Sequence, residues 1–198
     1  MLGAAADDSA MRKKREQIAY VLMVSVAEIE PKIWRRFIVP SSISLKKLHL
    51  VLQTVMGWSN YHLHQFETKQ GTYGTPDPDY SAILDEVRIR LDRFLIREGD
   101  QILYAYDFGD GWVHELQLQQ IIGPIEGDVT IECLDGGRTC PPEDVGGPHG
   151  YQEFLHAIRD RTHPEHANML SWVGGKFDSE HFNAKAINRE LVSGRRRA

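Results

Sequence analysis

The sequence predicts an α+β fold: a single domain with a largely antiparallel sheet, in which strands come early in the chain and helices late. Segments that alternate like strands lie before residue 122, helical spacing dominates after residue 150, and two turn-linked strands form a hairpin. The length of 198 residues suits one domain, and 41% hydrophobic with 26% charged residues is a globular composition.

The first predicted elements are two strands and a helix. Residues 18–28 are rich in Val, Ile and Tyr and predict a strand, and residues 32–39 predict a second strand that pairs back on it. Ser44 suits the N-cap of a helix over 45–56, whose apolar residues recur at helical spacing, and Gly57 suits its C-cap.

The middle of the chain mixes short strands with turns. Residues 62–68 alternate and predict a short strand, whereas the glycines and prolines of 71–78 predict a loop. Residues 82–96 are ambiguous, because part of the segment alternates like a strand and part suits a helical turn. Residues 101–106 and 112–121 predict the two strands of a hairpin, joined by an Asp- and Gly-rich turn.

The last third begins with an irregular stretch and ends in helices. Residues 123–150 are rich in glycine and proline and predict a long structured loop, a feature that is more often functional than not in compact domains. Helices are predicted over 151–159, 165–171 and 181–191.

The charge is unevenly distributed. The formal net charge is −5, but basic runs lie at 12–15 and 195–197. When these seven basic residues and the acidic Asp7, Asp8 and Glu16 are set aside, the rest of the chain holds 16 basic and 25 acidic residues. Such an acidic body argues against a broad nucleic-acid surface, although the basic ends could still contact nucleic acid. We expect residues 1–16 to be a disordered tail, 17–192 to be the domain, and 193–198 to be a basic tail.

Cysteine usage and hydropathy indicate a compartment. Cys133 and Cys140 are too few for a disulfide framework, and their spacing is not that of a zinc knuckle. No apolar run approaches the ~20 residues of a membrane-spanning helix, and the N-terminus lacks the order of a secretory signal. We therefore expect a cytoplasmic protein without a membrane partner.

His62 and His64 are the first candidate metal ligands. On a strand, residues two apart point to the same face, so both imidazoles would project together. Neutral imidazole is a common ligand of zinc, copper and iron. The alternative is that the pair lines a half-buried strand face beside Trp58 and Tyr61.

The hairpin turn holds a second group, Asp107, Asp110 and His114. Two carboxylates and an imidazole lie within eight residues across a tight turn, where they could share a metal ion, or an aspartate could orient the histidine as a general base. The alternative is ordinary turn chemistry, since Asp and Gly are the residues that hairpin turns favour.

A third group lies in the glycine-rich stretch. Pro141 and Pro142 stiffen the chain and present Glu143 and Asp144 in a fixed direction, which suits a hard cation or a basic peptide. The alternative is that these carboxylates cap the following helix. The chain has no Gly-x-Ser-x-Gly, Walker or His-Glu-x-x-His motif, so standard hydrolase and nucleotide sites are unsupported.

Several strings, in one order, resemble the plasmid pRiA4b ORF-3-like family, and the resemblance runs from about residue 18 to residue 191. The matching strings are PKIWRR at 31–36, LH at 48–49, MGW at 56–58, HLHQF at 62–66, YAYDFGDGWVH at 104–114, PPEDVGG at 141–147, and Phe177 and Asp178 with Phe182.

The resemblance implies an α+β domain with a curved, mixed or antiparallel sheet packed by helices. It implies little about function, because members are largely uncharacterised and some are labelled passenger or resolvase-like proteins of mobile elements. The sequence shows neither a serine-recombinase nucleophile with its arginines nor a DNA-reading helix, so it does not support a resolvase. We expect a plasmid- or mobile-element-associated protein.

The first functional hypothesis is a non-catalytic binding module for a protein or nucleic-acid partner. The sheet and the rigid proline loop would form a groove lined by aromatic residues, which dominate binding surfaces together with arginine. Arginines 35 and 36 alternate on their strand, so one of them should face outward. The candidate binding residues are Trp34, Arg35, Arg36, Trp58, Tyr106, Trp112, Glu143 and Asp144.

The alternative hypothesis is a metal-assisted hydrolase with a divalent metal ion as its cofactor. Convergence separates the two hypotheses, because metal ligands must face one point at about 2.0–2.2 Å, whereas dispersed groups favour the binding module. No catalytic residue is assigned. The candidate ligands are His62, His64, Asp107, Asp110 and His114, with Glu143 or Asp144 as a further ligand or base.

Overall fold

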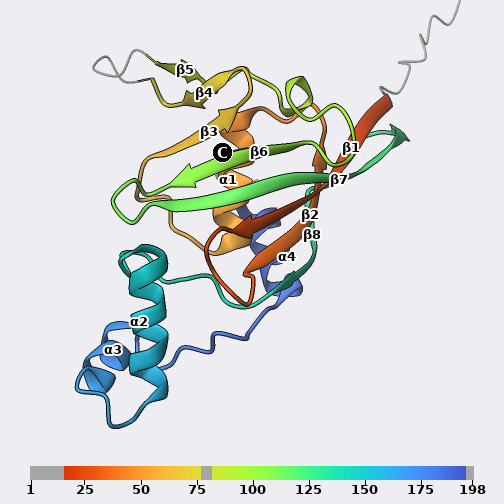
Figure 1. Cartoon of the computed structure of the whole chain (residues 1–198). Helices are drawn as coiled ribbons and strands as arrows, with labels where there is room; N and C mark the ends of the chain where they lie inside the picture. The colour runs from red at the N-terminus through yellow and green to blue at the C-terminus, as the bar shows by residue number, and fades with distance from the viewer. Residues whose placement is uncertain (1–15, 77–81, 195–198) are drawn as a thin grey trace, which may run out of the picture.

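The computed structural model describes residues 16–76 and 82–194 and confirms the predicted α+β class (Figure 1). Within these residues the strands form one open sheet and mostly precede the helices. In chain order the elements are β1 (Glu16–Val26), β2 (Trp34–Pro40), α1 (Leu45–Met56), β3 (His64–Thr68), β4 (Gly71–Gly74), β5 (Ile83–Asp85), the short 3-10 helix η1 (Leu91–Arg93), β6 (Gln101–Tyr106), β7 (Trp112–Glu126), β8 (Glu132–Gly137), α2 (Gly147–Arg159), α3 (His166–Trp172) and α4 (Ala184–Gly194).

The sheet has eight strands in the order β5-β4-β3-β6-β7-β1-β2-β8. Every neighbouring pair is antiparallel except β4 and β5, which run parallel. The predicted hairpin is confirmed, because Tyr106 pairs with Trp112 across the turn at 107–111. The predicted pairing of the first two strands is confirmed as well.

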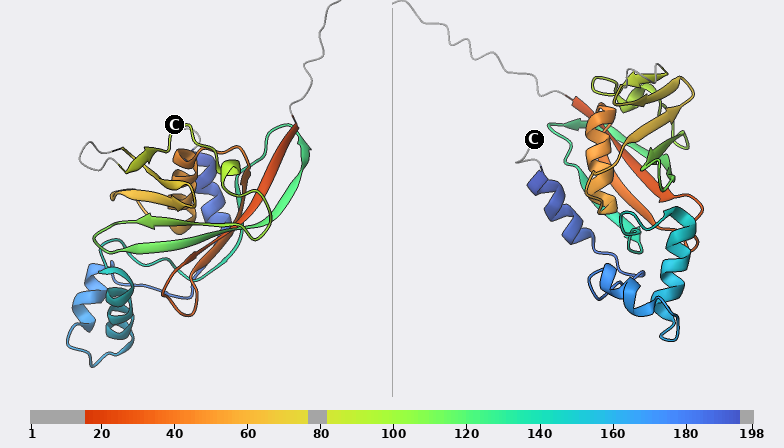
Figure 2. Two further views of the ribbon diagram at one scale, coloured as in Figure 1. Left: turned by 45° about the horizontal axis from the view of Figure 1, so that its top comes forward. Right: turned by 90° about the vertical axis from the view of Figure 1, so that its left-hand side faces the viewer.

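Register shifts in the long strands accompany the curvature of the sheet. The pairing of β1 with β7 shifts twice, and the pairing of β2 with β8 shifts once, between Arg36 and Phe37. A bulge places an extra residue on one strand, bends that strand and increases its twist. The sheet therefore curves around α1, as the two views of Figure 2 show, and most of this helix is buried.

Helix α1 begins and ends where its caps predict. The Ser44 Oγ accepts a hydrogen bond from the backbone N–H of Lys47 at 3.3 Å, and Gly57 adopts a left-handed φ of 89°. Besides its apolar residues, the helix buries two polar residues, His49 and Gln53, one turn apart.

The other helices occupy two places. Helix α4 lies beside α1 and covers the edge strand β8, whereas α2 and α3 pack as a pair near the β6–β7 turn (Figures 1 and 2). On β8, the side-chain amide of Asn188 accepts from the backbone N–H of Cys133 at 2.7 Å and donates to its carbonyl oxygen at 2.9 Å. The final helix is thus hydrogen-bonded to the sheet edge.

The predicted loop at 71–78 is wrong in its first half. Residues Gly71–Gly74 form β4, which pairs with β3 through the register Thr68↔Gly71; residues 77 and 78 lie outside the described part. One of the glycines that suggested a loop has a packing reason, because a Cβ on Gly74 would lie 2.9 Å from the His64 carbonyl oxygen. The ambiguous segment 82–96 contains both β5 and η1.

The predicted long loop at 123–150 is also wrong, because half of it is regular structure. Strand β7 continues to Glu126, β8 occupies Glu132–Gly137, and α2 already begins at Gly147. Two glycines of β8 allow close packing: a Cβ on Gly136 would lie 2.5 Å from the Phe182 ring, and one on Gly137 would lie 2.7 Å from Trp34 Nε1. These glycines are required by a tertiary contact rather than by a turn.

The predicted tails fall mostly on residues 1–15 and 195–198, outside the described part of the chain. Within the described ranges, no helix combines the length and apolar character needed to cross a membrane.

Candidate functional site

Three connecting segments meet near the end of β6. They are residues 58–63 between α1 and β3, the β6–β7 turn at 107–111, and residues 141–146 ahead of α2. Hydrogen bonds join them: the Trp58 indole N–H donates to the Pro141 carbonyl at 3.0 Å, and the Gly146 N–H donates to Asp110 Oδ2 at 3.0 Å. Parts of the chain that are 36 and 83 residues apart in sequence are thereby fixed side by side.

His62 lies at the centre of this junction, facing three carboxylates. Its Nε2 is 3.7 Å from Asp107 Oδ2, 3.7 Å from Glu143 Oε2 and 3.3 Å from Asp144 Oδ1. The Nε2 atom is sealed from solvent and has no hydrogen-bond partner in the described residues. Ligand atoms of His62, Asp107 and Asp144 all lie within 4.8 Å of one another, which makes them a candidate metal-binding group.

The turn backbone fixes the carboxylate of Asp107. This residue has a left-handed φ of 55°, its N–H donates to the Leu63 carbonyl at 2.9 Å, and its Oδ1 accepts from the N–H of Gly109 at 3.0 Å. Because Oδ1 is occupied by the turn, Oδ2 is left to face His62.

Glu143 is fixed by different partners. Its Oε1 accepts from the Ser59 N–H at 2.8 Å and from the Tyr106 hydroxyl at 3.2 Å. Burial, and then the charge of Glu143, raise the pKa of Tyr106 to about 12, so this phenol stays protonated and donates. Asp144, with a left-handed φ of 58°, is 71% exposed and forms the open side of the group.

Asp110 does not point at His62. Its Oδ2 accepts from the Gly146 N–H, so it ties the β6–β7 turn to the segment ahead of α2. The approach of these backbones is very close, because a Cβ on Gly147 would lie 2.1 Å from the Asp110 carbonyl oxygen. Asp110 therefore contributes to the site by holding two segments together.

The predicted common face of His62 and His64 is wrong. Strand β3 begins only at His64, so the rule that residues two apart share a strand face does not apply to His62. His64 is buried elsewhere, where its Nε2 is 2.9 Å from Glu86 Oε2 and its ring stacks on His49.

His114 is likewise separate from the carboxylates. It is fully buried, its Nδ1 lies 3.1 Å from the Tyr104 carbonyl oxygen, and its ring meets the edge of Trp58. Burial lowers the pKa of His114 to about 4, so the ring is neutral and its Nδ1–H donates to the carbonyl. Its Nε2 is sealed without a partner among the described residues.

The candidate aromatic groove is not an open surface. Trp58, Tyr106 and Trp112 are buried in the core, where Trp58 stacks on Tyr106 with ring centroids 4.8 Å apart. The two arginines of β2 point to opposite sides: Arg35 is buried, and Arg36, which is partly exposed like Trp34, contacts Gln119.

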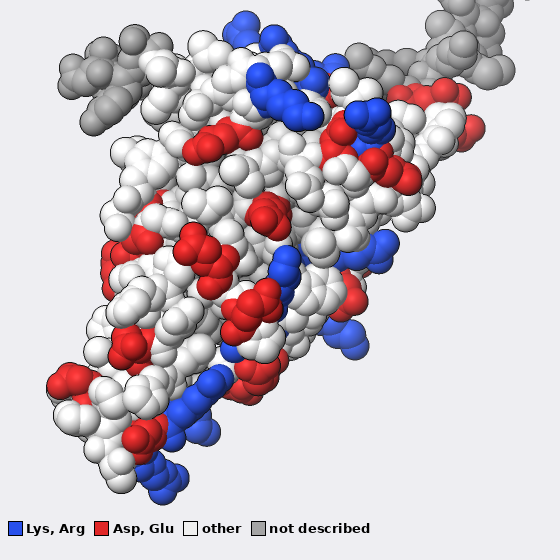
Figure 3. Space-filling view, in the orientation of Figure 1, with Lys and Arg blue, Asp and Glu red and all other residues white. Residues whose placement is uncertain are grey.

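Exposed apolar residues that are not among the predicted binding residues adjoin members of the group in sequence instead. Tyr61 and Leu63 flank His62 and are 78% and 63% exposed, and Phe108 follows Asp107 and is also exposed. Nothing in their local pattern marks them, because their exposure depends on how the three segments meet. Acidic and basic side chains are interspersed on the face drawn in Figure 3, which shows no continuous basic surface.

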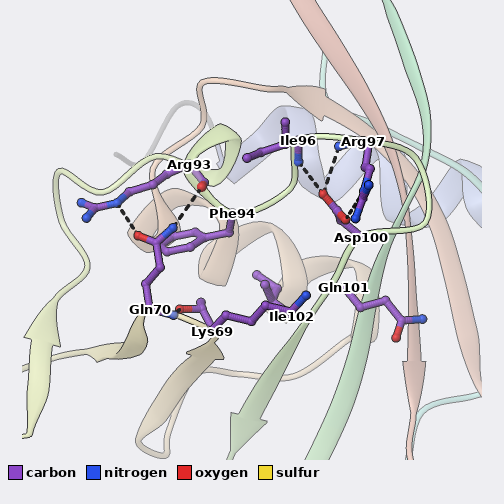
Figure 4. Close-up of a pocket in the computed structure, with 10 residues that line it drawn as sticks. Lys69, Gln70, Arg93, Phe94, Ile96, Arg97, Asp100, Gln101 and Ile102 are labelled. Atoms are coloured by element: carbon purple, nitrogen blue, oxygen red, sulfur yellow. Dashed lines mark hydrogen bonds and ion pairs between the residues drawn. The ribbon is translucent and has the colours of Figure 1, made fainter.

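A separate cavity of about 370 Å³ lies beside residues 68–70 and 93–102 (Figure 4). Its polar groups satisfy one another: Arg93 Nε donates to Gln70 Oε1 at 2.9 Å, and Asp100 Oδ2 accepts from the N–H groups of Ile96 and Arg97 at 2.8 and 3.0 Å.

Comparison with known proteins identifies a family, a related sequence and a solved structure that resemble this chain. The family described as plasmid pRiA4b ORF-3-like protein matches residues 18–186. A protein of Sinorhizobium fredii (strain NBRC 101917 / NGR234), described as "Uncharacterized protein y4hQ", is 39% identical over 173 residues, which cover 86% of this chain and 89% of that protein. The crystal structure of a protein of unknown function, MM3350 from Methanosarcina mazei Go1, matches with a TM-score of 0.78 and 34% identity over 87% of this chain and 98% of that one.

Proposed function

The chain belongs to the plasmid pRiA4b ORF-3-like family, and from the geometry around His62 we propose that it binds a divalent metal ion and uses it in hydrolysis. The observation that carries the proposal is the convergence of one imidazole and three carboxylates, Asp107, Glu143 and Asp144, from three separate segments.

The spacing supports a shared ion. Two ligand atoms that each lie about 2.1 Å from an ion are separated by about 3–4 Å. The distances of 3.3–3.7 Å from His62 Nε2 to the carboxylate oxygens fall in this range. They are long for hydrogen bonds, and Nε2 makes none among the described residues.

The charge supports the same proposal. Three carboxylates face one imidazole, which is an excess of acidic groups, and Asp107 and Glu143 are largely removed from solvent. A divalent cation would balance this charge. A set of one nitrogen and several oxygen ligands suits Mn²⁺, Fe²⁺ or Zn²⁺ better than it suits Mg²⁺ or Ca²⁺, which prefer oxygen ligands alone.

The exposed side of the group supports a chemical rather than a purely structural role. Structural metal sites are closed by protein ligands, whereas catalytic sites keep a position open to water or substrate. A bound ion would lower the pKa of a water molecule there towards about 7, which supplies a nucleophile for hydrolysis. Asp144 lies on this open side, and Glu143 is available beside it as ligand or base.

Metal analysis of the purified, untagged full chain tests the proposal. After incubation with Mn²⁺, Fe²⁺ or Zn²⁺ and removal of free ions, we expect near-stoichiometric metal in the wild type and in His149→Ala, a matched control whose imidazole is exposed. We expect its loss in His62→Ala and Asp107→Asn. A wild type that retains none of the three ions, or a His62→Ala variant that retains them, would contradict the proposal.

A binding module for a protein or nucleic-acid partner is the second candidate, and the exposed Tyr61, Leu63 and Phe108 favour it. Affinity capture followed by mass spectrometry tests it: partners held by the wild type and lost in Tyr61→Ser/Leu63→Ser would support a protein-binding role. A gel shift at two salt concentrations tests nucleic acid. The family's name suggests a mobile-element association, and the free cysteines favour the cytoplasm.

A further inference from the structure

A cavity of about 350 Å³ lies between α1, α4 and the segment at 139–143, with Arg35 among the residues that line it. Its volume is that of a site for a small organic molecule. The walls are mainly apolar and include Met56, Trp58, Phe177 and Ile187. Of the three carboxylates that face His62, Glu143 also lines this cavity, whereas Asp107 and Asp144 do not.

Arg35 is the unusual feature of the cavity. The residue is only 3% exposed, and among the described residues it forms no ion pair. Its Nε donates to the Val55 carbonyl at 2.9 Å, and its Nη1 donates to the carbonyls of Trp34 and Gly137 at 2.7 and 2.9 Å. The Phe182 ring lies 5.1 Å from its guanidinium carbon.

Nη2 is the part of the guanidinium that these contacts leave free. It has no hydrogen-bond partner in the described residues, and it is not among the polar atoms sealed from solvent. Since Arg35 lines the cavity, this nitrogen is the donor available to a molecule inside it. A nearly buried charge with a free donor is costly unless an anion satisfies it.

Among residues 16–76 and 82–194, no neighbouring group supplies that anion. Burial raises the pKa of Cys133 to about 11 and raises the pKa of Cys140 further, so both nearby thiols are neutral. Two carboxylates line the cavity, but neither pairs with Arg35: Glu143 is bonded to Ser59 and Tyr106, and Glu190 is an exposed residue of α4.

We propose that this cavity binds a small monocarboxylate with an apolar body, its carboxylate on Arg35 Nη2 and its body against the apolar walls. A single guanidinium balances a single negative charge, so a phosphate dianion would bring an uncompensated charge among apolar side chains. A planar aromatic or short aliphatic body matches the ring of Phe182 and the side chain of Ile187. The proposal concerns a site separate from the His62 group and does not depend on metal.

The test is a titration of the full chain with sodium benzoate, in which calorimetry and amide chemical shifts measure binding. Benzamide, the neutral equivalent of benzoate, is titrated in the same way for comparison. Because charge-assisted hydrogen bonds are stronger than neutral ones, benzoate should bind about tenfold more tightly than benzamide or better. Inorganic phosphate should neither bind nor compete.

Because a substitution of the buried Arg35 could itself disturb folding, the test changes two residues of α4 instead. Ala186 lines the cavity, so Ala186→Phe should fill it and abolish benzoate binding; Val192 is exposed and does not line it, so Val192→Phe should bind like the wild type. Equal affinities for benzoate and benzamide, tighter binding of phosphate, unchanged binding in Ala186→Phe, or no benzoate binding up to about 10 mM would each overturn the proposal.

Discussion

The imidazole rings of His49 and His64 lie parallel, with centroids 3.4 Å apart and an interplanar angle of 1°. Around them, His49 Nδ1 is 2.8 Å from the Tyr104 hydroxyl and Nε2 is 2.7 Å from Asn60 Oδ1. A neutral His49 satisfies both partners, since Nε2–H donates to the amide oxygen and Nδ1 accepts from the hydroxyl. The hydrogen bond from His49 to Asn60 therefore ties the buried face of α1 to the segment that carries His62.

Mild acid should destabilise the protein through His49. Burial, and then the charge on His64, lower the pKa of His49 to about 4, whereas in the unfolded chain it is about 6.5. The unfolded state binds this proton first, so the stabilisation is fully present above about pH 6.5 and is lost as the pH falls towards 4, a change of about 3 kcal/mol. Urea unfolding at several pH values measures it.

The variant His49→Gln isolates this contribution because its amide cannot take up a proton in this range. We expect a smaller loss of unfolding free energy between pH 6.5 and 4.5 than in the wild type. An identical pH dependence in the two proteins would show that His49 is not the group responsible.

His114 should contribute a second proton to the same window. Its pKa is lowered to about 4 by burial, so its contribution also disappears as the pH falls from about 6.5 towards 4. In His114→Phe we expect a shallower pH dependence and, at pH 7.5, a loss of unfolding free energy below about 1.5 kcal/mol, the value of one hydrogen bond. Metal uptake should be unchanged, and its loss would place His114 in the metal site.

Divalent ions should stabilise the folded chain. An ion that binds only the native state adds about 2.7 kcal/mol to the unfolding free energy at a hundred times its Kd. Thermal unfolding with Mn²⁺ or Zn²⁺ should therefore show a raised Tm in the wild type, reversed by a chelator, and no rise in His62→Ala or Asp144→Asn. Equal rises in all three proteins would indicate binding outside the His62 group.

The contact between Gly147 and Asp110 should tolerate no side chain. In Gly147→Ala the added Cβ would lie 2.1 Å from the Asp110 carbonyl oxygen, and we expect a loss of at least about 3 kcal/mol. Gly111→Ala is the matched control: its φ of 71° is close to the 69° of Gly147, but its Cβ would meet open space. Backbone strain alone should cost it about 1–2 kcal/mol. Similar losses in urea unfolding would mean that the clash is relieved at little cost.

The sequence predicts best the elements whose bounds depend on residues next to them in the chain. Helix α1 has its predicted bounds because Ser44 and Gly57 act on the backbone next to them. The short strands β4 and β8 were missed because their glycines are set by distant residues, as Phe182 and Trp34 are for β8. In such segments a tertiary contact outweighs the local preference.

The sequence predicts the members of the candidate site within a larger set, but it does not tell which members of that set meet. The three motifs supplied His62, Asp107, Glu143 and Asp144, and the structure brings these together. The motifs also supply residues that lie elsewhere. His64 is one of them, because two histidines two apart in sequence share a face only within a strand, and β3 begins at His64. One signal in the sequence points to a buried polar network beside α1. His49 and Gln53 lie one turn apart on the buried face of this helix, and two polar residues on a buried face need buried hydrogen-bond partners.

The amide of Asn188 has a consequence for how copies of this chain meet. An edge strand normally offers a row of N–H and C=O groups to which another chain can add a strand, which is the first step of sheet aggregation. At Cys133 both groups are already bonded to one side chain that imitates a neighbouring strand. With α4 across this edge and the opposite edge reduced to the three residues of β5, the sheet offers little for intermolecular strand addition.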